Sequence, residues 1–343
     1  SMREPSYSSQ TDWVQGSHPL TENINNRQLL HQFLLGSFPD GHDTMSEAAI
    51  HHFQNPGKML RGLMAIRAGE IFNIEKSAII FWAAAIETLH NASLVHDDIC
   101  DGHNARRGSQ SVWSKFGRNT ALMLGDALIA TAFDLASKAA EKLNKPQIVS
   151  LLAQRMSITA AGQAREFQLL SDVDWKTYDS ISADKTSPLL TAPLEGIAVI
   201  ISKYSMQKLL NDYFRLVGIA YQISNDILNF VGSDGANCLG SDMERRSPNA
   251  VVLTFKETLN FNDSCDFKKW YLSGKNEKLK YWIERILDSK SIIITAELLN
   301  KKLLESEYIA EKLLPEFLES VLPVRDHLNG IYRESVKKLK VCE

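Results

Sequence analysis

Apolar residues along this chain recur mostly at the three- and four-residue spacing of amphipathic helices. The segment 213–230 is apolar almost all round, which indicates a helix buried inside a large bundle. No series of alternating strands joined by hairpin turns is visible. The pattern therefore predicts an all-α fold, a single large helical bundle. Its clearest apolar stripes are formed by Phe81, Ala84, Ala85, Thr88 and Leu89, and by Leu122, Leu128, Ile129 and Phe133.

Short segments rich in Gly, Pro, Asn or Ser break this pattern at residues 55–57, 144–146, 232–240 and 273–274. Residues 260–280 are polar and mixed in charge, which predicts a surface connection. No Pro/Gly/Ser-rich linker divides the chain, so we expect one domain rather than two. The predicted organisation is a polar N-terminal tail over residues 1–25, followed by a single helical domain over residues 26–343.

The composition of the chain narrows its class. The 343 residues, 44% of them hydrophobic and 23% charged, are typical of a globular protein with a large core. A formal net charge of −3 gives no global field for binding nucleic acid or an anionic membrane. No uninterrupted apolar run of about 18 residues predicts a membrane span. The four cysteines form no CxxC pair, which predicts a reduced, cytoplasmic protein without a disulfide framework or a zinc site.

Three carboxylates cluster at the end of a strongly apolar segment, in the sequence HNASLVHDDICD over residues 90–101. On a helix, Asp97 and Asp101 are one turn apart and project from the same face, with Asp98 beside them. Like charges this close repel one another, so the cluster is either a solvated helix end or a cation site. Mg²⁺ binds one or two carboxylates and keeps positions for water and phosphate oxygens. The cluster therefore predicts a Mg²⁺ site.

Basic residues flank the acidic cluster on both sides. Arg106 and Arg107 follow it shortly and would supply planar, permanently charged donors for a phosphate. Upstream, Lys58 and Arg61 share one helical face close to a predicted helix start, a geometry that suits an anion. Together, the groups predict two anionic ligands, one bound through metal and one held directly by side chains.

The ordered motifs resemble the trans-isoprenyl diphosphate synthases, also called polyprenyl synthetases, over roughly residues 55–255. The segment GKMLRG resembles the family's GKxxRP element. HNASLVHDDICD, followed by ARRG and FGRNTALMLGDALIA, resembles the first aspartate-rich region and the helix after it. Each element alone is weakly specific, whereas the ordered set is highly specific. Further short matches are Gly162-Gln163, Lys185-Thr186 and Tyr221-Gln222-Ile223.

This resemblance implies an isoprenoid synthase-type bundle around a central apolar cavity. It also implies that the protein is a Mg²⁺-dependent prenyltransferase and forms a homodimer. It implies that an allylic prenyl diphosphate is ionised at its C–O bond, attacked by the double bond of isopentenyl diphosphate, and then loses a proton. The implied Mg²⁺ ligands are Asp97, Asp98, Asp101, Asn225 and Asp226. The implied contacts are Arg106, Lys185 and Gln222 to the allylic diphosphate, and Lys58, Arg61, His90 and Arg107 to the acceptor diphosphate.

The second aspartate-rich region departs from the family's usual DDxxD, because it reads NDILN over residues 225–229. Downstream, Asp242 is retained, but Ser247 stands where the family has a lysine and Asn249 where it has a threonine. An amide oxygen can bind Mg²⁺ but adds no charge, so metal on this side should bind more weakly. Asn225, Asn229 and Ser233 also share the spacing of the metal motif of terpene cyclases, although the last two residues do not match it.

Three functions stay open from these residues. They are a chain-elongating prenyl diphosphate synthase, a relative that cyclises a prenyl diphosphate or prenylates another acceptor, and a non-catalytic subunit of a synthase. The four acceptor-site residues favour the synthase, because a cyclase has no second diphosphate to bind. A non-catalytic subunit would have little need for Asp97 and Asp101.

The prenyl tail is expected to lie along the apolar helix that ends in the acidic cluster. One helical turn rises about 5.4 Å, comparable to one isoprene unit, so residues at successive turns before Asp97 act as possible floors. The first turn back carries Ala92 and Ser93, both small, where short-chain members of the family often have an aromatic ring. This open floor predicts a product of about C20. The deeper floors are Thr88 and Leu89, and then Ala85 and Ile86.

Overall fold

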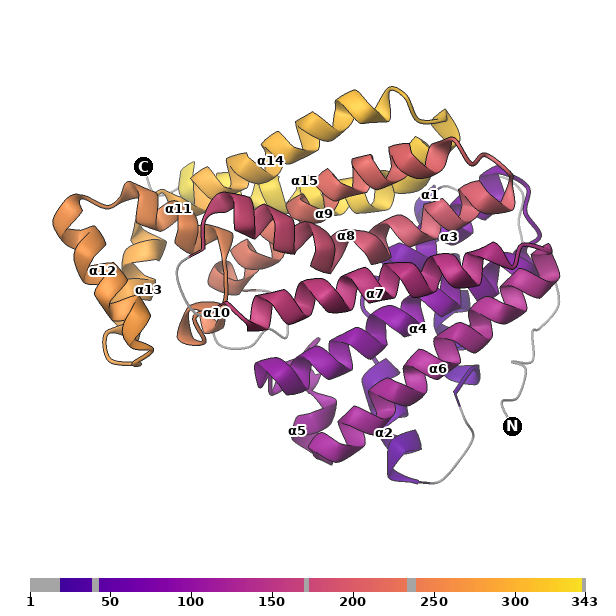
Figure 1. Cartoon of the computed structure of the whole chain (residues 1–343), viewed down its shortest axis with the longest axis horizontal. Coiled ribbons are helices and arrows are strands. Elements are labelled where there is room, and N and C mark those ends of the chain that lie inside the picture. Colours follow the sequence, from indigo (N-terminus) through magenta and orange to yellow (C-terminus); the bar gives the residue numbers. More distant parts are fainter. Residues whose placement is uncertain (1–18, 39–42, 170–172, 233–238, 341–343) are drawn as a thin grey trace. The chain divides into compact units, whose positions relative to one another are not determined.

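The computed structural model describes residues 19–38, 43–169, 173–232 and 239–340. Over these residues the chain is helical apart from one hairpin of two-residue strands, which confirms the all-α prediction (Figure 1). The helices are α1 (Pro19–Gly36), α2 (Thr44–Phe53), α3 (Leu60–Ile71), α4 (Lys76–Asp101), α5 (Val112–Phe116), α6 (Arg118–Leu143), α7 (Gln147–Phe167), α8 (Trp175–Ile200), α9 (Met206–Val231), α10 (Ser241–Glu244), α11 (Ala250–Thr258), α12 (Phe261–Ser273), α13 (Leu279–Asp288), α14 (Ser291–Ala310) and α15 (Pro315–Lys340). Strands β1 (Ala105–Arg106) and β2 (Ser109–Gln110) pair antiparallel.

The chain folds into two compact units. The first contains the described residues up to Gln154, together with Ala192–Tyr204 and Pro315–Ser320. The second contains Arg155–Thr191, Ser205–Leu314 and the described residues from Val321 onward. Helix α1 begins at Pro19, inside the segment predicted as a polar tail. The single domain over residues 26–343 stays a prediction.

Helices α4 and α6 form the centre of the first unit, and small residues let them approach closely. On α6, Ala121, Ala132 and Ala136 are fully buried. Gly125 is required there, because a Cβ atom at this position would collide with the ring of His96 on α4. The predicted stripe on α6 is only partly correct: Leu128 is buried, whereas Leu122 is 46% exposed.

Other helices of the first unit close over α4. Trp82 of α4 is fully buried, and its indole N–H donates to the backbone oxygen of Pro193 at 3.2 Å. A Cβ atom on Gly196, one turn further along α8, would collide with this indole. On α1, Phe33 meets Phe81 of α4 edge to face, with ring centroids 5.0 Å apart. The core of this unit is thus continuous from α1 to the start of α4.

The second unit has its own core. Helix α9 buries Tyr213, Phe214 and Phe230 fully, as the apolar pattern of residues 213–230 predicts. It packs against α14 and α11. Between the latter two, the hydroxyl of Thr295 donates to the hydroxyl of Thr254 at 3.0 Å. This buried polar contact is satisfied, so it costs the core little.

Residues 260–280 were predicted to be a surface connection, and this prediction was wrong. Helix α12 begins behind Asn260, whose side chain accepts a hydrogen bond from the backbone N–H of Asp263 at 2.9 Å. Helices α12 and α13 lie side by side (Figure 1) and share an aromatic core, in which the rings of Phe267 and Trp282 are 5.1 Å apart. Asn260 was the sequence signal for this helix start.

The other predicted breaks agree with the structure where it is described. Residues 55–57 lie between α2 and α3, residues 144–146 between α6 and α7, and residues 273–274 at the end of α12. The break at 232–240 falls between α9 and α10, and its residues 233–238 lie outside the described residues. Gly and Pro coincide with helix ends at these breaks, because neither residue continues a helix at low cost, although Pro323 lies inside α15.

Two helices, α4 and α6, are long and apolar enough to cross a membrane by length and composition alone. In α4, 83% of the most apolar window is buried inside the protein, and in α6 the share is 44%. Helix α4 is therefore a core helix, and α6 turns its apolar inner face onto it. Their apolar character belongs to the core of the first unit.

Candidate active site

The acidic cluster occupies the last turns of α4. The helix ends at Asp101 because Gly102 adopts a left-handed conformation (φ 67°) and donates its N–H to the backbone oxygen of Asp98. Asp97 and Asp101 are both partly exposed on these turns. The two carboxylates predicted as Mg²⁺ ligands are thus brought together on the final turns of a rigid core helix.

Asp98 has a different environment from its two neighbours. It is only 2% exposed and accepts two hydrogen bonds from Arg106, from Nε at 3.1 Å and from Nη2 at 2.5 Å. His103 lies 3.5 Å away. Burial alone would raise the pKa of Asp98, but hydrogen bonds from His103 and Arg106 outweigh it, so the pKa is lowered. The structure therefore pairs a predicted metal ligand with a predicted phosphate donor.

Arg107 sits at the turn of the hairpin formed by β1 and β2. It has a left-handed conformation (φ 51°), followed by Gly108 (φ 83°), as a two-residue hairpin turn requires. Its backbone oxygen accepts from Asn55 Nδ2, and its Nη1 donates to the backbone oxygen of Asn55, both at 3.0 Å. Its guanidinium lies so close to Gly57 that a Cβ atom there would be 2.7 Å from Cζ. The hairpin thus brings Arg107 to the GKMLRG segment.

Arg61 belongs to this segment and lies on the first turn of α3. Its Nη1 is 3.3 Å from Nε2 of His90 on α4. Burial, together with the charges of Arg61 and Arg107, holds the pKa of His90 well below its ordinary value, so the imidazole is neutral. Partial burial also lowers the pKa of Lys58. Two of the predicted acceptor-site residues, Arg61 and His90, are therefore direct neighbours.

Three residues that the sequence did not predict support this basic group. Glu87 is buried on α4 and accepts the backbone N–H of Gly62 at 2.8 Å, which fixes the start of α3. Asn91 Oδ1 is 2.9 Å from His52 Nε2 and accepts from Arg107 Nη1 at 3.3 Å. The available signals were Asn91, a polar residue six positions before Asp97, and Glu87, an acidic residue inside an apolar run. Both residue types are costly to bury without partners.

Acid is expected to destabilise the first unit through His52. Burial, and then the charge of Arg107, lower the pKa of His52 from 6.5 to about 4. Between these pH values the folded protein binds fewer protons than the unfolded chain, so stability is present above pH 6.5 and is lost as the pH falls toward 4. From about pH 7 to pH 4.5, His52 should contribute a loss of about 2 kcal/mol.

Urea unfolding of the wild type and of His52→Gln at these two pH values checks this expectation. The free energy of unfolding of the variant should fall by about 2 kcal/mol less than that of the wild type, because glutamine does not titrate. An equal loss in both proteins would contradict the assignment to His52.

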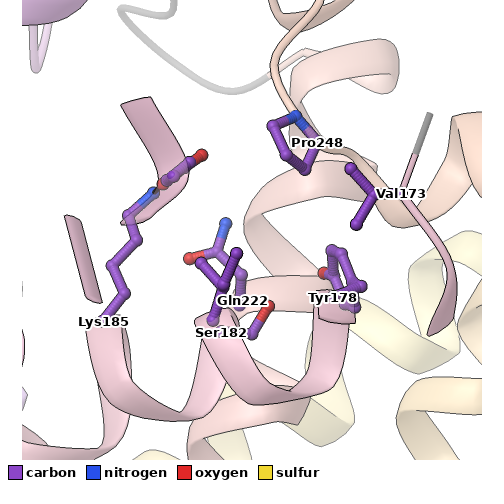
Figure 2. A pocket seen from close by; sticks show the side chains of 8 residues that line it. Val173, Tyr178, Ser182, Lys185, Gln222 and Pro248 are labelled. Carbon is purple, nitrogen blue, oxygen red and sulfur yellow. Dashed lines mark ion pairs between the residues drawn. The ribbon is translucent and has the colours of Figure 1, made fainter. Parts of the chain in front are cut away.

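In the second unit, Lys185 and Gln222 line one pocket. Tyr178, Ser182 and Lys185 point into it from α8, and Val173 and Pro248 face them (Figure 2). Lys185 forms an ion pair with Glu166 at 2.7 Å. Gln222 accepts a hydrogen bond from Thr186 at 3.1 Å. The pocket holds about 270 Å³ of space, part of it open to solvent.

Asp226 lies beside this pocket in a dense hydrogen-bond network. Its carboxylate accepts from Tyr178 Oη at 2.5 Å and from Gln222 Nε2 at 3.0 Å. Burial and the nearby charge of Asp242 raise its pKa. Burial, and then the proximity of the Asp226 charge, raise the pKa of Tyr178 well above its ordinary value, so the phenol keeps its proton. Asn225, the preceding residue on α9, is exposed.

The first acidic cluster suits a divalent cation. Within the described residues, no group of three or more His, Cys, Asp or Glu side chains is arranged to hold a metal by itself. Mg²⁺ needs no such group, because it takes one or two carboxylates and fills its other positions with water and phosphate oxygens. Asp97 and Asp101, partly exposed at a helix end, are a suitable pair of donors.

The fold and these charged groups are those expected of an all-helical enzyme that binds diphosphates. Residues 42–286 match the polyprenyl synthetase family, and the chain belongs to that family. Its members are prenyltransferases of isoprenoid biosynthesis, with prenyl diphosphates and isopentenyl diphosphate as substrates and a divalent metal as cofactor. The family and enzyme class implied by the motifs are thus confirmed.

Curated relatives include synthases of different product length. The chain is 31% identical over 212 residues to a geranylgeranyl diphosphate synthase of Sulfolobus acidocaldarius, covering 60% of this chain and 63% of that protein. It is 30% identical over 278 residues to the geranylgeranyl diphosphate synthase of Saccharolobus solfataricus, covering 78% and 80%. It is 26% identical over 231 residues to the octaprenyl diphosphate synthase of Haemophilus influenzae, covering 66% and 69%.

Solved structures share the fold. A polyprenyl synthase from Caulobacter crescentus, complexed with calcium and isoprenyl diphosphate, matches with a TM-score of 0.79 at 21% identity, covering 90% of this chain and 95% of that one. A geranylgeranyl pyrophosphate synthetase from Geoglobus acetivorans matches with a TM-score of 0.74 at 26% identity, covering 89% and 98%. These matches confirm the isoprenoid synthase-type architecture.

The predicted site residues are distributed over the two units. The first unit contains Lys58, Arg61, His90, Asp97, Asp98, Asp101, Arg106 and Arg107, and the second contains Lys185, Gln222, Asn225 and Asp226. Ser233, part of the cyclase-like spacing, lies outside the described residues. The roles of all these residues in binding metal and substrate stay predictions.

Proposed function

We propose that this protein is a Mg²⁺-dependent prenyl diphosphate synthase that joins an allylic prenyl diphosphate to isopentenyl diphosphate. The observation that carries the proposal is the pairing, within one unit, of an acidic turn and a separate basic group. Asp97 and Asp101 face solvent at the end of α4, while Arg61, His90 and Arg107 gather at the start of α3. Two different means of holding a diphosphate suit a reaction with two diphosphate substrates.

In this reaction the allylic C–O bond breaks, and the diphosphate leaves with the electron pair. The double bond of the acceptor then forms the new C–C bond, and the proton lost from the acceptor goes to the departing diphosphate. Mg²⁺ held by Asp97 and Asp101 would supply positive charge to the leaving group. Arg61 and Arg107 hold the acceptor diphosphate, and neutral His90 adds a hydrogen bond to it.

In the second unit, Lys185 and Gln222 are proposed to bind oxygens of a substrate diphosphate. Both line the same pocket, and Lys185 already faces a carboxylate, Glu166, across it. Arg106 is proposed to act from its bidentate pair with Asp98, which fixes the orientation of its guanidinium.

We further propose that the protein is cytoplasmic and forms a homodimer. The dimer is supported by Leu122 and Met123, which leave α6 with exposed apolar surface.

Incubation with labelled isopentenyl diphosphate, Mg²⁺ and C5, C10, C15 or C20 allylic diphosphates tests the function. Longer diphosphates are expected. Hydrocarbon products formed without isopentenyl diphosphate would instead identify a cyclase, the second candidate, which the spacing of Asn225 and Asn229 along the sequence favours. Turnover that requires a second chain would identify a subunit.

The proposed product length is about C20, and it depends on the small first floor of α4. Ala92 is fully buried one turn before the acidic cluster, as are Thr88 and Leu89 one turn deeper. Two of the archaeal relatives named above make geranylgeranyl diphosphate, whereas the Haemophilus relative makes an octaprenyl chain. Identities of 26–31% do not fix the product length, so the proposed length rests on the residues along α4.

Ala92→Phe is therefore expected to shorten the product by one or more isoprene units. The ring would fill the first turn below the acidic cluster, at an overpacking cost of about 1–3 kcal/mol in stability. Chain length is read by chromatography of the dephosphorylated products. Ser93→Ala, on the same turn, is the control, because it keeps a small side chain. An unchanged length in folded Ala92→Phe would rule out this path for the tail.

A further inference from the structure

The carboxylate of Asp226 is buried and accepts three hydrogen bonds within the second unit. Its Oδ2 accepts hydrogen bonds from Tyr178 Oη at 2.5 Å and from the backbone N–H of Ala250 at 2.9 Å. Its Oδ1 accepts from Gln222 Nε2 at 3.0 Å. The side chain is 1% exposed. Three donors from α8, α9 and α11 therefore surround one buried carboxylate.

The amides of this region are also used for contacts between helices. Asn229 Nδ2 donates to the hydroxyl of Ser241 at 2.9 Å, and Asn229 Oδ1 accepts the backbone N–H of Asp242 at 3.3 Å. These bonds attach α9 to α10. Asn229, at the last position of the motif, thus connects two helices through its side chain.

Asn249 completes the same network. Its Oδ1 caps α11 by accepting the backbone N–H of Val251 at 2.8 Å. Its Nδ2 donates to Asp242 Oδ2 at 3.1 Å and to the backbone oxygen of Asp226 at 3.2 Å. A threonine hydroxyl has a single donor and sits on a shorter side chain, so it could not replace both hydrogen bonds of the asparagine NH₂ group. The asparagine at this position is therefore explained by its contacts.

Mg²⁺ does not fit the carboxylate of Asp226. The ion requires near-octahedral oxygen coordination and keeps several of its waters, so it needs an accessible carboxylate with free lone pairs. We propose that Asp226 is a structural anchor that fixes the start of α11 against α8 and α9, in place of the metal role that its motif implies. Within the NDILN segment, Asn225 is exposed, whereas Asp226 is buried.

The anchor is tested first by stability, in EDTA and without substrate. Asp226→Asn and Tyr178→Phe should each lower the urea midpoint of unfolding. Their double variant should lose less than the sum of the two single losses, because both changes remove the same hydrogen bond. A metal ligand would cost nothing in EDTA. Additive losses, or an unchanged midpoint in Asp226→Asn, would overturn the anchor.

Metal binding is the second readout, measured as free Mn²⁺ by electron paramagnetic resonance in the presence of inorganic diphosphate. Asp226→Asn should bind the same number of Mn²⁺ ions as the wild type, with a Kd changed by less than about twofold. Asp97→Asn, the matched control in the first unit, should raise the Kd roughly tenfold or more. Loss of a bound Mn²⁺ in Asp226→Asn would overturn the proposal.

Tyr178→Phe keeps the test decisive if Asp226→Asn does not fold. Removing the phenol hydroxyl frees part of Asp226 Oδ2 while leaving the carboxylate in place. An anchor predicts a less stable protein with unchanged Mn²⁺ binding, whereas a metal ligand that competes with Tyr178 predicts tighter binding. Neither readout requires turnover, so this inference can fail while the proposed synthase activity holds, and the reverse.

Discussion

Asp97→Ala is expected to lower kcat for prenyl transfer by a factor on the order of 10³, with little loss of stability. The carboxylate lies on the last turns of α4, partly exposed and close to the carboxylate of Asp101. Removing it takes away a proposed Mg²⁺ ligand and the charge that the cation would bring to the leaving diphosphate. It also relieves repulsion between two like charges, so the fold should tolerate the change. Steady-state kinetics and thermal unfolding measure the two effects.

Asp126→Ala is the matched control, because it removes an aspartate of the same unit from an exposed position on α6. Asp126 faces the ring of His96 at 3.6 Å and takes no part in the proposed site. Its loss should leave kcat within about twofold, as expected of an exposed surface contact. Asp98→Ala, in contrast, should lower the stability of the fold, because it removes the carboxylate partner of the Arg106 guanidinium. Full activity in folded Asp97→Ala would show that Asp97 is not a Mg²⁺ ligand.

Arg107→Gln is expected to raise KM for isopentenyl diphosphate by roughly 10- to 100-fold, the equivalent of losing charge-assisted hydrogen bonds of about 1.5–3 kcal/mol. Arg107 is held in place before substrate arrives, by Asn55 and Asn91 and by the hairpin turn. Its guanidinium therefore binds an anion without first losing rotamer entropy. Kinetics with the acceptor varied at saturating allylic substrate measure the effect.

The distinguishing feature of this prediction is its selectivity between substrates. KM for the allylic diphosphate should change much less, because Arg107 is proposed to bind the acceptor. Arg67→Gln is the control: Arg67 lies on α3 in the same unit and bonds to Glu319 instead. Equal increases in both KM values for Arg107→Gln would show that the acceptor site is elsewhere.

Helix identity could be read from the sequence because it depends on local spacing. The apolar run over residues 213–230 is the buried part of α9, and the breaks predicted at residues 55–57, 144–146 and 273–274 lie at helix ends. The failure at residues 260–280 has a specific cause. Their polar residues lie on solvated faces, while Phe267, Trp270 and Trp282 form a small core only when α12 and α13 meet. The sequence of either short helix alone therefore gives little indication that the two helices pack together.

In the first acidic cluster, too, the position of the residues is a local property, whereas their environments depend on tertiary contacts. The sequence placed Asp97, Asp98 and Asp101 on one helix end, since three adjacent carboxylates are a local feature. Their different environments depend on the hairpin that follows, which presents Arg106 to Asp98. Glu87 and Asn91 were missed for a related reason. Each is a single polar residue in an apolar helix, and its partner lies 25 or more residues away or at the hairpin turn.

Sequence by itself determined the helical class, the family and the candidate site residues, because periodicity and ordered motifs are properties of the chain alone. Tertiary structure decided which of those residues remain available. Asp226 stands in a metal motif, yet Tyr178, 48 residues away, and Ala250, 24 residues away, surround its carboxylate. Burial and hydrogen-bond partners are set by contacts between distant segments, so the availability of a carboxylate follows from the fold and not from the motif.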